Sequence, residues 1–458
     1  MKFSKQAILA RVHKIPSIRF EDQQLTSFGG AIVFQMLFQR LNLKARLKQC
    51  FQPVKGSAVF GPHRIVLLLI VHLLLGFRRL RAVDYYRDDP VVQRLLGLRR
   101  LPDVATISRT LAAMGRDSVE KVRALCSALV IDALRRECFS RLTLDFDGSV
   151  TSTRGHVEGT AVGYNSKKKG ARSYYNLYCT VAQTGQFLDV LHRPGNVHDS
   201  RGAHEFMMDT FDRVRGSLPT TVLESRMDSA FFSQKTLTLM DLYGVECSVS
   251  VPFERFLVLK QMIESRRRWR YLDGDRSYFE SDWQAKSWPA SYRFLFVRRK
   301  AHLQVKEALQ LDLFQPRETD YDYRVVVTNK TGSARSVLLF HYGRGSQEGV
   351  FAEAKQHAGL GLIPTRRLLG NRMVTLCAMM AHNLGREMQM IAHPRSNYFR
   401  AKRPAAWAFQ TLDTLRHRFI MRAARLTLPQ GELTLTLSSN PMVKKDLLHF
   451  VEALQKAA

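Results

Sequence analysis

The stretch from Leu142 to Val150 reads Leu-Thr-Leu-Asp-Phe-Asp-Gly-Ser-Val. Its apolar residues alternate with Thr143, Asp145 and Asp147, which is the period of a β-strand with one apolar and one acidic face. Two carboxylates on one face repel each other and resist burial unless a cation lies against them. A divalent metal ion would favour such a face, and a solvated edge strand explains it equally well. The rest of the chain must decide between the two.

Charge is the strongest compositional signal of the chain. Its 458 residues contain 70 Lys and Arg against 40 Asp and Glu, a net charge of +30 at pH 7. Such an excess favours a polyanionic partner, most often nucleic acid, with a ribosome- or lipid-associated protein as the alternative. The hydrophobic content of 45% excludes a disordered or membrane-embedded chain.

Cysteines and apolar runs indicate the cellular compartment. None of the six cysteines forms a C-x-x-C pair, so neither a zinc site nor a disulfide framework is indicated. The N-terminus lacks an apolar core long enough for a signal peptide. The longest apolar run, Ile65 to Phe77, holds thirteen residues, fewer than the roughly 20 of a membrane span. We expect a cytoplasmic, nucleoid-associated protein with no membrane partner, in which this run forms a buried helix.

Changes in residue pattern divide the chain into five parts. The first reads as helical and basic, which suits a DNA-end-binding region and suits equally a helical layer packed on the main domain. The others are a mixed α/β part, a β-rich insertion, a second mixed part with a long apolar helix, and a basic C-terminal region. The predicted boundaries are 1–140, 141–251, 252–340, 341–398 and 399–458.

Local periodicity predicts the elements within these parts. We expect strands at 142–150, 174–182, 186–191, 220–228, 246–251, 292–298, 323–328 and 432–437. We expect helices from 107, at 200–215, at 234–243, from about 252 through the arginine run at 266–270, at 342–355, at 368–390 and from 444.

Three acids lie on separate predicted elements: Asp147 on the first strand, Asp228 at the end of a later strand, and Glu348 on a helix. Carboxylates that converge from different elements can hold two Mg²⁺ or Mn²⁺ ions. One ion would activate water or a 3′-hydroxyl, and the other would stabilise the leaving oxygen of an in-line displacement at phosphorus. Hard oxygen ligands suit this metal class better than zinc. Asp145, on the face of Asp147, is a second candidate ligand.

Two bases flank Glu348 at helical spacing. Arg344 precedes it by four residues and Lys355 follows it by seven, so the three lie near one face of a helix. Such a group can serve metal and phosphate together, and a plain salt-bridge stripe has the same spacing. His198 and Asp199 invite an acid–base interpretation, but a hydrogen-bonded loop pair is favoured.

Further cations and aromatic residues are candidates for DNA contact. Three successive lysines in a predicted loop can meet phosphates. Three of the four tryptophans fall within 252–340, close to an arginine run, which suits stacking on bases. Buried tryptophans in an ordinary β-layer are the alternative. The candidates are Lys167, Lys168, Lys169, Arg266, Arg267, Arg268, Trp269 and Trp288.

The segment R-G-S-Q-E-G-V-F-A-E-A-K, from Arg344 to Lys355, resembles the R-x3-E-x6-K part of the Y-R-E-K signature of bacterial insertion-sequence transposases. The family's tyrosine falls at His341, one residue before Tyr342. D-F-D-G-S-V at 145–150 and R-M-D-S-A-F-F at 226–232 resemble the family's two aspartate motifs. G-Y-N-S-K-K-K-G and R-P-G-N-V-H-D-S, which lie between those motifs, are similar to the subgroup called DDE domain group 1.

This resemblance, over about residues 20 to 440, implies an α/β fold: a ribonuclease-H-like domain interrupted by a β-rich insertion between Asp228 and Glu348. It implies a DDE transposase that cuts DNA at the ends of its element and joins the 3′ ends to target DNA. The implied catalytic and metal-binding residues are Asp147, Asp228 and Glu348, with Mg²⁺ or Mn²⁺. The implied partners are terminal inverted repeats, target DNA and a second copy of the chain. Relatives with this insertion form a DNA hairpin and stack a flipped base on tryptophan, which would be Trp288 or Trp269 here.

Two other functions stay open. One is a catalytically inactive, domesticated relative that only binds DNA, although three acids in matching motifs weigh against it. The other is a ribonuclease-H-like, structure-specific nuclease such as a junction resolvase. Cleavage products separate the nuclease from a transposase, because only a transposase joins its 3′ ends to a second DNA.

Overall fold

The acidic stretch forms β2 (Arg141–Ser152) in a computed structural model that describes residues 17–21, 23–52, 59–163, 165, 168–300, 321–395 and 405–456. β2 pairs antiparallel with β4 (Arg172–Val181) on one side and parallel with β6 (Val222–Met227) on the other. The edge-strand interpretation is therefore wrong, because a strand paired on both sides must find partners for its polar face inside the protein.

The central sheet has the strand order β3-β4-β2-β6-β7-β11-β10-β9-β8, and β5 (Gln186–Leu191) pairs with β4. β3 (Ala161–Val162) is a short addition beside β4. β2, β6 and β7 (Glu246–Val251) run parallel, whereas β4 is antiparallel to both β2 and β5. β2, β4, β5, β6, β7 and the helices between them follow the predicted elements within a few residues, whereas the short β3 was not predicted.

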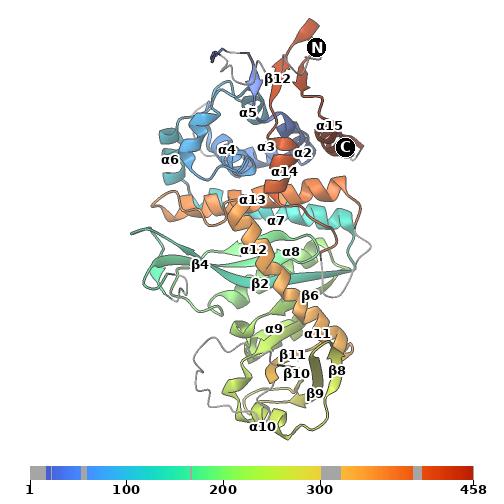
Figure 1. Ribbon diagram of the computed structural model, residues 1–458. Helices are drawn as coiled ribbons and strands as arrows, with labels where there is room; N and C mark the ends of the chain where they lie inside the picture. Colours follow the sequence, from blue (N-terminus) through green and yellow to red (C-terminus); the bar gives the residue numbers. More distant parts are fainter. Residues whose placement is uncertain are drawn as a thin grey trace.

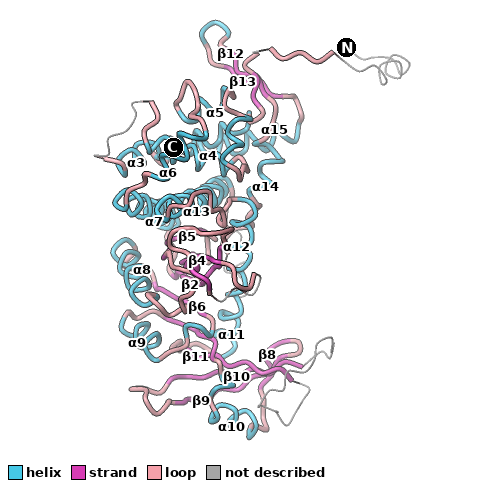
Figure 2. Tube along the Cα trace, turned by 90° about the vertical axis from the view of Figure 1, so that its left-hand side faces the viewer, coloured by secondary structure: helices cyan, strands magenta, loops and turns pink. Residues whose placement is uncertain are grey.

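Two sets of helices cover the two faces of this sheet, as Figure 2 shows. α8 (Ala203–Ser217) and α9 (Gln234–Leu242) lie on one face, where Phe206 and Phe211 of α8 meet Phe146 edge-on. α11 (Ala334–Tyr342) and α12 (Ser346–His357) run along the other. The alternation within β2 thus sends its apolar residues toward α8 and its acids toward α11 and α12.

The predicted β-rich insertion extends the same sheet. β11 (Tyr321–Thr328) pairs antiparallel with β7, and β10 (Tyr292–Lys300), β9 (Arg276–Trp283) and β8 (Arg270–Asp273) follow outward. β8 and β9 were not predicted, because their charged residues mask the alternation and pairing with β10 supplies the order. The arginine run was predicted to lie on a helix, whereas α10 (Leu257–Ser265) ends before Arg266.

The N-terminal helices that precede α7 form a layer at one end of the molecule (Figure 1). They are α2 (Ile32–Arg40), α3 (Leu43–Cys50), α4 (Pro62–Leu74), α5 (Pro90–Leu96) and α6 (Val104–Ala112). C-terminal elements join this layer: β12 (Ala424–Thr427) pairs with β1 (Leu25–Thr26) and with β13 (Thr434–Leu437), and α14 (Leu412–Leu415) and α15 (Pro441–Lys456) lie beside it.

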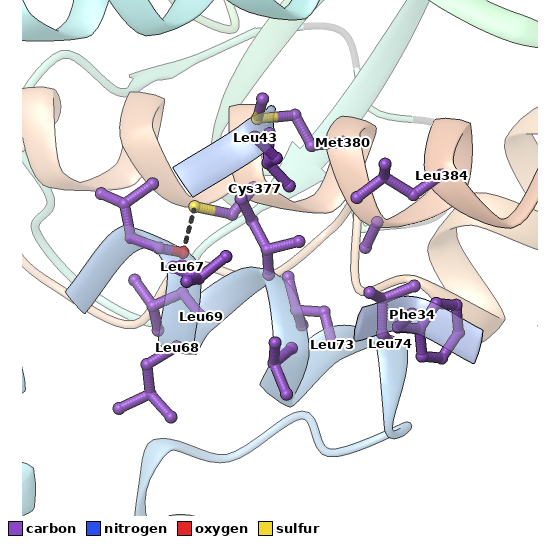
Figure 3. Close-up of a cluster of buried hydrophobic side chains, with 14 of the residues drawn as sticks. Phe34, Leu43, Leu67, Leu68, Leu69, Leu73, Leu74, Cys377, Met380 and Leu384 are labelled. Atoms are coloured by element: carbon purple, nitrogen blue, oxygen red, sulfur yellow. Dashed lines mark hydrogen bonds between the residues drawn. The ribbon is translucent and has the colours of Figure 1, made fainter. Parts of the chain in front are cut away.

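Two long helices, α7 (Arg116–Glu137) and α13 (Leu368–Ala392), lie between the helical layer and the sheet. α4 forms from the apolar run and is buried from Ile65 to Leu74, as predicted. Figure 3 shows α4 packed beside α13 among buried leucines, and the Sγ of Cys377 on α13 lies 3.9 Å from the carbonyl oxygen of Val66. None of the described helices is both long and apolar enough to span a bilayer.

A buried ion cluster ties α7 and α8 to the sheet. The side chain of Asp189 on β5 is fully buried, and its carboxylate accepts hydrogen bonds from Arg123 Nε at 2.6 Å and from Arg213 Nη1 at 2.9 Å. One buried acid with two bases is the arrangement in which a buried charge is tolerated. This cluster holds the helices that frame β2, and hence the position of its acids.

Candidate functional site

Asp147, within β2, and Asp228, directly after β6, come together on neighbouring parallel strands. The register of β2 and β6 pairs Asp145 with Arg226. Two residues further along, on the same face, β2 carries Asp147 and the segment after β6 carries Asp228. Asp228 also caps the short helix Ser229–Phe231 by accepting a hydrogen bond from the backbone N–H of Ala230 at 3.0 Å. The two carboxylates therefore lie side by side where β6 ends.

The two carboxylates lack sufficient positive charge around them. Burial, and then the charge of Asp228, raise the pKa of Asp147 to about 7. Burial also raises the pKa of Asp228. The nearest base is Arg344, whose Nη1 lies 3.8 Å from Oδ2 of Asp147, and its charge lowers both pKa values. One arginine thus offsets the charge of two partly buried acids only in part.

Glu348 reaches the same region from α12. It lies in the first turn of this helix, which follows the short helical turn Gly343–Gly345 that carries Arg344. Its side chain is exposed and lines a cavity of about 430 Å³ together with Ser229, Arg324 and Arg344. Within the described ranges, no three His, Cys, Asp or Glu side chains lie close enough together to hold a metal ion. The structure thus pairs Asp147 with Asp228 and leaves Glu348 at the wall of the adjoining cavity.

Asp145 is engaged elsewhere, so its interpretation as a second metal ligand is not supported. Its Oδ1 accepts a hydrogen bond from Arg226 Nε at 2.9 Å, and its Oδ2 accepts one from Arg226 Nη2. Both side chains are only 1% exposed. A bidentate arginine satisfies the carboxylate and leaves no room for an ion.

The predicted phosphate-binding residues differ in their surroundings. Lys355 lies on α12 with Glu348, and its Nζ lies 3.4 Å from the carbonyl oxygen of Val150 in β2. Arg78 of the helical layer donates to the carbonyl oxygen of Lys355 at 3.0 Å. Lys168 and Lys169 are exposed before β4, and Lys167 lies outside the described residues. Arg266, Arg267 and Arg268 are exposed between α10 and β8.

Both candidate tryptophans are half-buried in aromatic clusters of the extended sheet. Trp269 meets Phe279 edge-on with ring centres 4.7 Å apart, and the guanidinium of Arg298 lies 4.8 Å from its ring centre. Trp288 packs against Phe232 at 5.5 Å and Tyr292 at 5.6 Å. Phe232 follows Asp228 by four residues, so Trp288 contacts the segment that carries this acid.

His341, at the position of the family tyrosine, is a buried structural residue. Its two ring nitrogens lie 2.9 Å from the hydroxyls of Ser248 and Ser250 on β7. Burial, followed by the charges of Arg344 and Arg226, lowers its pKa to about 3, so the ring is neutral. It forms part of the cavity wall beside Tyr342.

His198 and Asp199, predicted as a hydrogen-bonded loop pair, bond to different residues. His198 bonds to the hydroxyl of Ser200 at 3.0 Å, whereas the carboxylate of Asp199 lies 3.5 Å from Nη2 of Arg193. The charge of Asp199 raises the pKa of both Asp147 and Asp228. The only sequence signal was the R-P-G-N-V-H-D-S motif itself, because nothing local indicates which way the loop folds.

The sequence matches the model of the family "Transposase DDE domain group 1" over residues 12–458, nearly the whole chain. The chain belongs to this family. The predicted relationship to insertion-sequence DDE transposases is thereby confirmed. A comparison with curated protein sequences found no significant match to this transposase chain.

Among solved structures, this DDE transposase chain is similar to a piggyBac transposase synaptic complex with hairpin DNA. The identity is 10% and the TM-score 0.39, over 93% of this chain and 85% of the other. It is also similar to Mos1 transposase in a paired-end complex with the left transposon end, with 9% identity and a TM-score of 0.17, over 42% of this chain and 59% of the other. For the Mos1 mariner paired-end complex with Mn, the identity is 11% and the TM-score 0.18, over 48% of this chain and 72% of the other.

Proposed function

We propose that this chain is an active transposase that cuts DNA at the ends of its insertion sequence and joins the freed 3′ ends to target DNA. We also propose that β5-β4-β2-β6-β7 and their helices form a ribonuclease-H-like catalytic domain. The order of these strands supports this, because β2, β6 and β7 are parallel and β4 runs antiparallel between β2 and β5. The insertion then enters after β7 and returns to α11.

The observation that carries this proposal is the pair of partly buried carboxylates, Asp147 and Asp228, level with each other on neighbouring strands. Their raised pKa values indicate a site that lacks a cation. Carboxylate oxygens fit Mg²⁺ or Mn²⁺, so Asp147 and Asp228 would hold the metal, with Glu348 joining from α12. Bound there, divalent ions would supply nucleophile activation and stabilise charge at the phosphorus.

The chain's own cations would hold the DNA backbone beside these acids. Arg344 lies next to Asp147, and Lys355 lies on α12 two helical turns after Glu348, next to β2. Phosphates of one strand would bind to both, which places a scissile phosphate at the acids. Lys168, Lys169 and the arginines that follow α10 would contact DNA further away. A second copy of the chain would bind the other element end, because both ends must be cut together.

The test is strand cleavage of a duplex that carries the element's terminal inverted repeat. Asp147→Asn, Asp228→Asn and Glu348→Gln should each abolish cleavage, about a thousandfold or more, and leave binding of the DNA end intact. Asp209→Asn, an exposed acid on α8, is the matched control and should cleave normally. Full cleavage by Glu348→Gln would show that another acid completes the site.

The reaction products of the unaltered protein separate the alternative functions. A transposase leaves 3′-hydroxyls that become joined to a second DNA. A structure-specific nuclease gives cleavage without joined products, and an inactive relative binds the end and cleaves nothing.

A hairpin intermediate would place a flipped base on a tryptophan, and Trp288 is the better placed because it packs on Phe232, close to Asp228. Trp288→Ala should lose hairpin formation and retain nicking, while Trp269→Ala should retain both. An unchanged hairpin yield in Trp288→Ala would contradict this role.

A further inference from the structure

Asp199 lies in the loop between β5 and α8, and its carboxylate reaches β2 at the residue after Asp147. A Cβ on Gly148 would lie only 2.7 Å from Oδ1 of Asp199 and 2.4 Å from the hydroxyl oxygen of Tyr175. Gly148 therefore leaves the space that these two polar groups occupy. The close approach fixes the Asp199 carboxylate against the residue that follows Asp147, although the two segments are about fifty residues apart in the sequence.

Arg193 holds the loop in this position. It is 5% exposed, its Nη1 donates to the carbonyl oxygens of Asp199 at 2.7 Å and Arg201 at 3.1 Å, and its Nε donates to that of Tyr175 at 3.1 Å. The guanidinium also lies 5.1 Å from the centre of the Tyr175 ring. The loop is thus pinned to β4 by one buried side chain, and the position of Asp199 follows from it.

The carboxylate of Asp199 is only partly satisfied by this arrangement. Oδ1 lies 3.5 Å from Nη2 of Arg193, an ion-pair contact without a direct hydrogen bond, and the Tyr175 hydroxyl hydrogen-bonds to the same carboxylate. The side chain is 17% exposed, and an ionised carboxylate has about four acceptor positions, so these two contacts leave it able to accept a further hydrogen bond.

Resting on the proposed function, we propose that Asp199 is a positioning residue of the acidic site: its carboxylate strengthens the binding of a divalent cation by Asp147 and Asp228. It would add negative charge next to the pair and would accept a hydrogen bond from a water molecule of the hydrated ion. Mg²⁺ in particular keeps several of its waters when it binds to proteins. Asp199 would act through Asp147 and Asp228 and would not touch the DNA.

A plain structural role makes a different prediction. If Asp199 only fastens the loop through Arg193, its loss lowers the stability of the protein and leaves cation affinity unchanged. Cation affinity and metal-free stability therefore have to be measured separately on the same variants.

The experiment uses the full chain, stripped of metal and titrated with Mn²⁺. Bound Mn²⁺ is followed by electron paramagnetic resonance and by the rise in the midpoint of thermal unfolding, taken from each variant's own metal-free midpoint. Asp199→Asn should raise the Mn²⁺ concentration at half-saturation at least tenfold. Asp199→Glu keeps the negative charge, so its Mn²⁺ concentration at half-saturation should lie between those of the unaltered protein and Asp199→Asn. Asp209→Asn, the same charge change on an exposed part of α8, should match the unaltered protein.

Cleavage of element-end DNA supplies a second measurement. Asp199→Asn should need at least tenfold more Mn²⁺ for half-maximal cleavage and should recover most of its rate at saturating Mn²⁺. Half-saturation within twofold of the unaltered protein would overturn the inference, whatever the metal-free stability. Asp147→Asn distinguishes a failure of the proposed metal site from a failure of the role of Asp199. If Asp147→Asn also leaves Mn²⁺ binding unchanged, the proposed metal site is wrong. If Asp147→Asn abolishes Mn²⁺ binding and Asp199→Asn does not weaken it, only the role of Asp199 is wrong.

Discussion

Asp145 and Asp147 lie two residues apart on the same face of β2. Asp145 is 1% exposed and both of its oxygens are bonded to Arg226. Asp147 is 21% exposed, has Arg344 at 3.8 Å, and lies beside a second acid, Asp228. The inner acid has a complete partner within the fold, whereas the outer one shares a single, more distant base with another acid.

The difference follows from where β6 ends. At the level of Asp145 the neighbouring strand supplies Arg226, and two residues further on the chain has left the strand and supplies Asp228. A buried acid paired with its own arginine is tolerated in the fold, and removing either partner destabilises the protein because the other charge stays buried without compensation. A pair of acids with too little cation is unfavourable by itself and so is suited to binding one from solution.

The largest expected effect tests the inner acid. Asp145→Asn should lower the free energy of unfolding by about 3–5 kcal/mol, because it leaves the buried Arg226 without its counter-charge. Asp147→Asn should cause no loss in metal-free buffer, because it removes repulsion from Asp228. Urea unfolding of both variants, in the presence of a chelator, measures the contrast. If both substitutions lower the free energy of unfolding equally, the claim that Asp145 is neutralised by Arg226 and Asp147 is not would be contradicted.

The pH dependence of stability tests the outer acid. The pKa of Asp147 is raised in the folded state from 3.8 to about 7, so the folded protein binds the proton more tightly than the unfolded chain does. Its contribution therefore favours folding at low pH and is lost as the pH rises from about 4 to about 7, by up to about 4 kcal/mol in metal-free buffer. Asp147→Asn should flatten this part of the profile, measured by urea unfolding at pH 5 and pH 7.5. Parallel profiles for the variant and the unaltered protein would contradict the raised pKa.

The smallest expected effect concerns the base that the two outer acids share. Arg344→Ala should weaken binding of element-end DNA by about 1 kcal/mol, or roughly fivefold, and should reduce the slope of log affinity against log salt by about one. Lys355→Ala should behave alike. Arg335→Ala, an exposed arginine on α11, serves as the control. An unchanged salt slope in Arg344→Ala would mean that this base serves only the acids.

Local pattern was enough to predict most of the elements that carry the site. The alternation around Phe146 predicted β2, and the apolar run from Ile65 predicted α4, because both depend on residues that are close in sequence. β8 and β9 were missed for the same reason, since their order depends on pairing with β10. The joining of the chain's two ends through β1 and β12 likewise left no local signal.

The sequence by itself determined that Asp147, Asp228 and Glu348 are the acids to consider, because family motifs and spacing surround each of them. Only the tertiary structure decided which acids are neutralised. Asp145 meets Arg226 across 81 positions, and Asp199 reaches Gly148 through a loop held by Arg193. The charge balance of a site depends on neighbours in space, and strand register and loop anchoring, which no short stretch of sequence contains, choose those neighbours.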